Sequence, residues 1–123
     1  MVTYKLPWVG VNIELHEYID GRGCNHYREW VSKLDASVRA RIDKSIFRVG
    51  YGNFSGSKPE GEGVSAIRLD FGPGYRIYFG QDGATLVILL AGGTKRRQEN
   101  DIKLAKSLWS EYKRRKRESK REK

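Results

Sequence analysis

Polar and apolar residues alternate in two neighbouring stretches of the sequence, residues 67–71 and 75–79. This alternation is typical of strands with one buried face, and the Gly-Pro-Gly sequence between them indicates a tight turn. The polar positions, which we expect on one face of a hairpin, are Arg68, Asp70, Arg76 and Tyr78. With a three-residue turn, Asp70 would lie opposite Arg76, and Arg68 opposite Tyr78.

Further basic side chains lie near this hairpin in the sequence. Lys58 precedes it in a glycine-rich segment, and Lys95 follows the next apolar stretch. Clustered cations repel one another, so such a face favours an anionic ligand such as a phosphodiester. Arginine and lysine would neutralise the phosphate while tyrosine stacks on a base or moves a proton, and RNA can then be cleaved without metal by its own 2′-OH. The alternative is that Arg68 and Arg76 are solvated strand residues that pair with Asp70.

The N-terminal half of the chain predicts a strand followed by two short helices. Residues 12–18 alternate like a half-buried strand. Apolar positions within residues 27–49 follow helical spacing in two groups, and Asn25 and Asp35 are plausible N-caps. We expect the two helices to pack as a hairpin and residues 50–63 to form an ordered loop.

The C-terminal half completes the predicted fold. Residues 85–91 are apolar on both faces, which suits a central strand that Gly92-Gly93 then ends, and residues 97–116 show helical spacing. The order β-α-α-β-β-β-α predicts the α+β class. We expect an antiparallel sheet of about four strands packed against an N-terminal helical hairpin and a C-terminal helix, with the helices on one sheet face.

Composition and charge indicate one basic domain. The chain has 123 residues and a net charge of +9, and residues 95–123 carry 13 basic and 5 acidic side chains. This excess points to an anionic or acidic partner. The longest apolar run is far shorter than the roughly twenty residues of a membrane span, and no secretory leader is evident. The single cysteine favours the cytoplasm.

Other motifs predict no metal site and no cofactor. Cys24 and His26 lack further ligands at suitable spacing. Gly93-Thr94-Lys95 lacks the upstream glycine of a phosphate-binding loop. His16 would be a general base only if the first strand lay beside the arginines.

Two longer motifs, GPGYRIYF at residues 72–79 and LLAGGTKRRQ at residues 89–98, occur in a characteristic order and separation. They resemble the addiction-module killer proteins, which are RelE/HigB-type toxins of bacterial type II toxin–antitoxin systems in the RelE/ParE superfamily. The similarity covers residues 11–116 as a single toxin domain. Residues 1–10 would then be an N-terminal extension, and residues 117–123 a basic tail.

The resemblance implies a RelE-like fold and a metal-independent endoribonuclease, an mRNA interferase acting on translating ribosomes. Carried over by position, the catalytic residues would be Arg68, Arg76 and Lys95. The RNA-binding residues would be Lys58, Tyr78, Arg96 and Arg97, of which Tyr78 comes from the face argument alone. The implied partner is a cognate antitoxin with a helix-turn-helix DNA-binding domain.

Two alternatives remain open at this point. The wider superfamily includes ParE-type toxins, which inhibit DNA gyrase and cleave no RNA, and a shared fold does not establish the activity. The chain would otherwise be a non-toxic, basic nucleic-acid-binding domain on the same fold.

Overall fold

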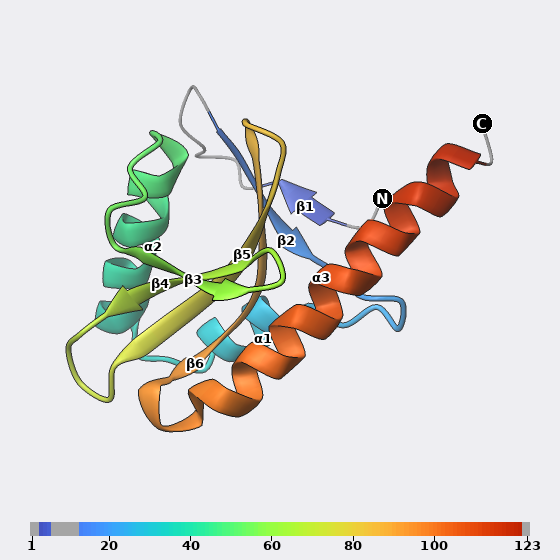
Figure 1. The fold of residues 1–123 in the computed structure, drawn as a ribbon. Coiled ribbons are helices and arrows are strands. Elements are labelled where there is room, and N and C mark those ends of the chain that lie inside the picture. The colour runs from blue at the N-terminus through green and yellow to red at the C-terminus, as the bar shows by residue number, and fades with distance from the viewer. Residues whose placement is uncertain (1–2, 6–12, 122–123) are drawn as a thin grey trace.

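The computed structural model describes residues 3–5 and 13–121 and has a mixed α+β fold (Figure 1). The elements are β1 (Thr3–Lys5), β2 (Glu14–Tyr18), α1 (His26–Val31), α2 (Ala36–Gly50), β3 (Ser57–Gly61), β4 (Val64–Leu69), β5 (Tyr75–Asp82), β6 (Leu86–Thr94), a 3-10 turn (Lys95–Arg97) and α3 (Gln98–Arg121). The predicted α+β class is therefore confirmed, together with a C-terminal helix. No helix within the described residues is long and apolar enough to cross a membrane.

The strands form one sheet in the order β1-β2-β6-β5-β4-β3. The expectation of about four strands is wrong, because β2–β6 already supply five within residues 13–121 and the short β1 adds a sixth. The strand β3 lies in the glycine-rich segment that was expected to be a loop. Its sequence, SKPEG, has little intrinsic strand preference. Pairing with β4 makes it a strand, at an edge where its proline is tolerated.

The sheet is not fully antiparallel, which corrects a second expectation. Strands β4 to β6 form the predicted antiparallel meander, and β3 extends it by pairing antiparallel with β4. By contrast, β2 runs parallel to β6, with Leu15 opposite Val87. Two helices and three strands separate β2 from β6 in the sequence, so the connection is long enough for a parallel pair. Alternation in β2 indicates which residues share a face and carries no information on strand direction.

Helices cover both faces of the sheet, whereas one face was expected. Residues of α1 and α2 share a core with Val87 and Leu89 of β6, and residues of α3 share a second core with Ile88 and Leu90. Figure 1 shows α2 and α3 on opposite sides of the sheet. The central position predicted for β6 is confirmed, and its two apolar faces require a cover on each side.

The helix boundaries follow the predicted caps closely at the N-terminal ends. Asn25 caps α1 by accepting a hydrogen bond from the Arg28 backbone N–H, and Asp35 precedes α2. At the other end of the chain, α3 continues to Arg121, so residues 117–121 of the predicted tail are helical.

Glycines within the central strands let the helices approach closely. The strand β6 continues through Gly92 and Gly93 instead of ending there. A Cβ atom at Gly92 would lie 2.0 Å from Cε3 of Trp30 in α1, and one at Gly80 would lie 2.3 Å from Cε3 of Trp109 in α3. A bare backbone is required at both positions, because each tryptophan ring occupies the space of a side chain.

We therefore expect Gly92→Ala to destabilise the protein by about 2 kcal/mol, because the new methyl group overlaps the Trp30 ring. The measurement is the free energy of unfolding in urea. Gly56→Ala is the matched control, since no atom lies within 4 Å of a Cβ there. Equal stability of the two variants would contradict this packing.

Candidate functional site

The hairpin that carries the predicted site has a longer turn than expected. Strands β4 and β5 pair with Arg68 directly opposite Arg76 and Leu69 opposite Tyr75, so residues 70–74 form the loop. The Gly74 backbone N–H donates to the Phe71 carbonyl at 3.0 Å within this loop. The predicted register, with Asp70 opposite Arg76, is therefore wrong, and two arginines face each other across the strands.

A groove of about 520 Å³ lies where this hairpin, β3 and the start of α3 meet. Its lining residues are Lys58, Glu60, Arg68, Asp70, Arg76, Lys95, Arg96, Gln98, Glu99 and Ile102. We call this the catalytic groove, after the role that the resemblance predicts for three of its residues. It brings together the three residues predicted to be catalytic and two of those predicted to bind RNA. All of its basic residues except Arg76 are exposed.

Arg76 forms the buried side of the catalytic groove. Its side chain is 6% exposed, and Nη1 lies 3.7 Å from the carboxylate of the exposed Asp70. The same Nη1 donates to the Tyr75 carbonyl at 3.1 Å. Nε is buried and has no hydrogen-bond partner among the described residues. The alternative prediction, in which Arg76 is a solvated strand residue paired with Asp70, is therefore only half right. The ion pair with Asp70 is present, but the Arg76 side chain is buried.

The hairpin loop places Lys95 beside Arg76. The Lys95 backbone N–H donates to the Gly74 carbonyl at 2.7 Å. A Cβ at Gly74 would lie 3.1 Å from Cβ of Lys95 and 3.6 Å from Nη1 of Arg76. Gly74 also has a φ of 78°, which a side chain would strain. A glycine at this position therefore leaves room for two basic residues from different elements to lie side by side.

Tyr78 does not lie on an open surface, which corrects its predicted role in contacting RNA. The residue is 1% exposed and belongs to the core beneath α3. Burial raises the pKa of its hydroxyl to about 12, with Asp101 and Glu60 adding to the shift. The strand pattern correctly placed Tyr78 on the arginine side, but could not reveal that α3 covers this part of the face.

Asp101 is a half-buried acidic residue that the sequence interpretation did not assign to the site. It lies in the first turn of α3, where its Oδ2 would be 1.9 Å from a Cβ at Gly93. Oδ2 is buried without a hydrogen-bond partner among the described residues. Burial raises the pKa of this carboxyl, and the nearby charge of Arg97 opposes the shift. The adjacent glycines in β6 were a signal of close approach, but they did not identify the approaching residue.

The remaining candidates lie away from the catalytic groove. Arg97 is exposed in the 3-10 turn and does not line the groove. His16 lies on β2, which β6 separates from β5, and its ring contacts Thr3 and Glu14. The structure therefore does not place His16 beside the arginines.

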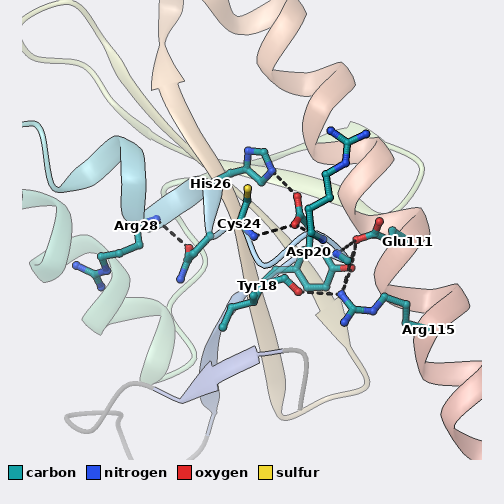
Figure 2. Close-up of polar contacts among 11 residues, drawn as sticks. Tyr18, Asp20, Cys24, His26, Arg28, Glu111 and Arg115 are labelled. Carbon is teal, nitrogen blue, oxygen red and sulfur yellow. Dashed lines mark hydrogen bonds and ion pairs between the residues drawn. The ribbon is translucent and has the colours of Figure 1, made fainter.

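The loop before α1 is held by polar contacts to α3 (Figure 2). The Tyr18 hydroxyl and the Gly21 backbone N–H donate to Glu111, and Arg115 donates to the Ile19 carbonyl at 2.9 Å. Nε2 of His26, the first residue of α1, lies 2.8 Å from a carboxylate oxygen of Asp20 in this loop. Among the described residues, no group of three or more side chains is arranged to hold a metal ion. We interpret the polar residues of this loop as structural, because their contacts join the loop to α1 and α3.

We expect Tyr78→Phe to leave the free energy of unfolding unchanged or to raise it by about 1 kcal/mol. The reason is that the buried hydroxyl has no partner, so its removal relieves a desolvation cost. Urea unfolding measures this, and RNA binding by the variant should equal that of the wild type. A loss of stability near 1 kcal/mol or more would show that the hydroxyl has a partner.

We also expect Asp101→Asn to be more stable than the wild type near pH 7. A raised pKa in the folded state means that the native protein binds more protons there than the unfolded chain does, so stability falls as pH rises through this range. The free energy of unfolding should be measured from about pH 3 to pH 8 for the variant and the wild type. The stability gained by Asp101→Asn should shrink at acidic pH, because Asp101 is then protonated in both the folded and the unfolded wild type. A gain independent of pH would contradict this origin.

We compared the chain with protein-family models, with solved structures and with the sequences of other proteins. No protein-family model matches it, and no solved structure gives a significant match. An uncharacterized protein of Haemophilus influenzae is 42% identical over 86 residues, which cover 69% of this chain and 87% of that protein. Identity and coverage at this level reflect common descent, and the chain belongs to the same family as this Haemophilus influenzae protein.

Proposed function

We propose that the protein is the toxin of a toxin–antitoxin pair and a metal-independent endoribonuclease that cleaves mRNA. The observation that carries the proposal is the catalytic groove, where Arg68, Arg76 and Lys95 from three separate elements line one surface. These are the positions that the resemblance to RelE/HigB-type toxins marks as catalytic. Lys58 and Arg96 extend the basic lining on either side of them.

The groove suits stabilisation of a phosphorus centre that gains negative charge. Attack of the 2′-OH forms an O2′–P bond and breaks the P–O5′ bond, which leaves a cyclic phosphate and a 5′-OH. Arg76 is buried, so its charge acts at lower effective dielectric than that of an exposed arginine. Arg68 and Lys95 are exposed and contact the phosphate from the open side. Glu60 and Glu99 line the groove and supply an acceptor for the 2′-OH proton. The same proton then passes to the departing O5′, which gives the 5′-OH and leaves the carboxylate as it began.

Neutralisation by an antitoxin fits the same electrostatics. The basic side chains of the catalytic groove outnumber its acidic ones, and we propose that an acidic segment of a helix-turn-helix antitoxin covers them in the cytoplasm. The target would be mRNA on translating ribosomes, as in the toxins that the motifs resemble.

The test is to map transcript 5′ ends in bacteria after brief induction of the protein. We expect new internal mRNA ends with the wild type, and about 10²-fold fewer with the double variant Arg68→Gln/Lys95→Gln, which removes transition-state contacts. Both residues are exposed, so these changes avoid the folding risk that Arg76→Ala carries at a buried position. Arg22→Gln is the matched control, because Arg22 is exposed and lies outside the groove.

Two results would overturn the proposal. Cleavage by the double variant at the wild-type level would refute the site. Growth arrest with intact transcripts would refute the nuclease, and inhibition of gyrase supercoiling by the purified protein would then identify a ParE-type activity.

A further inference from the structure

A second basic groove, of about 460 Å³, lies between α2 and the tip of the β4–β5 hairpin. We call it the α2 groove. Its basic lining residues are Arg41, Lys44, Arg48 and Arg68, and Asp70 is its acidic one. The sequence interpretation assigned no site on α2, because apolar spacing explained that helix as a core element.

The basic residues of α2 form a row that is open to a ligand. Arg41, Lys44 and Arg48 are spaced by three and four residues, so they lie on one face of the helix. All three are exposed, and within residues 13–121 no ion pair engages any of them. The row extends about 10 Å along the helix axis, which suits neighbouring phosphates of one strand.

Arg41 is held in place before any ligand binds. Its guanidinium carbon lies 3.5 Å from the centroid of the Phe71 ring, in the hairpin loop. A cation stacked on an aromatic face keeps its N–H edges free for hydrogen bonds in the guanidinium plane. Ordering of this side chain lowers the entropic cost of binding a phosphate.

The α2 groove and the catalytic groove share two lining residues. Arg68 and Asp70 line both, so the two meet at the end of the β4–β5 hairpin. The combined surface turns around the hairpin from the α2 side of the sheet to the α3 side, which lie on opposite faces (Figure 1). A single strand can follow such a turn, whereas a duplex is stiff on this length scale.

We propose that the α2 groove is a second phosphate-binding subsite, which holds the single-stranded RNA that flanks the nucleotides in the catalytic groove. This inference rests on the proposed function for the identity of the ligand. A phosphate backbone fits better than an acidic protein, because protein interfaces have an apolar centre. Here the apolar lining is limited to Leu69, which is 9% exposed, and Phe71, which Arg41 covers.

The test measures how binding of uncleavable 2′-O-methyl RNA depends on salt. Oligonucleotides of about three and about ten nucleotides are compared by fluorescence anisotropy, since only the longer one can reach both grooves. For the longer RNA, Arg41→Gln/Arg48→Gln should reduce the slope of log K against log salt by about 1.4, or about 0.7 for each lost phosphate contact. Binding of the shorter RNA should stay unchanged.

The matched control is Arg22→Gln/Lys33→Gln, which removes the same charge from exposed positions outside both grooves. An equal slope change in the control, or an equal loss for both RNA lengths, would overturn the subsite. An unchanged salt slope in the Arg41→Gln/Arg48→Gln variant would also overturn the subsite. The basic row on α2 would then be assigned to binding an acidic protein. A wild type that binds RNA by this pattern yet cleaves none would refute the proposed nuclease and leave the subsite supported.

Discussion

Burial of β6 on both faces is the constraint on which the rest of the structure depends. Alternate residues of this strand enter two separate cores, one under α1 and α2 and the other under α3. Burying apolar surface away from water stabilises the fold, and an uncovered face of β6 would forgo this contribution. The three helices must therefore divide between the two faces. This division places α2 at one basic groove and the start of α3 at the other.

The cover provided by α3 separates the arginine face of the hairpin into a buried and an exposed part. Tyr78 and the side chain of Arg76 lie within the covered part, and Arg68 lies beyond it. Asp101 enters the same layer because Gly93 leaves room for it. Three buried polar atoms, one each from Arg76, Tyr78 and Asp101, remain without hydrogen bonds there among the described residues. Their desolvation opposes folding, which is typical of sites where function constrains the sequence.

Much of the fold and of the candidate site could be predicted from residue patterns. Alternation placed Arg68 and Arg76 on one face, and the two-sided apolar pattern of residues 85–91 correctly identified the central strand. The resemblance assigned Lys95 to the same site as the arginines, and Lys95 lines one groove with them. These predictions succeed because side-chain direction repeats every two residues in a strand, whatever its neighbours are.

The sequence by itself determined the α+β class, the central strand and the residue types that gather in the catalytic groove. Only the tertiary structure decided the parallel pairing of β2, the strand formed by residues 57–61, the burial of Tyr78 and the place of Arg68 between two grooves. The physical reason is that local periodicity specifies which way a side chain points. Contacts between segments far apart in the chain decide the direction of a strand, which helix covers a sheet face and how exposed each side chain remains. No local pattern encodes these contacts.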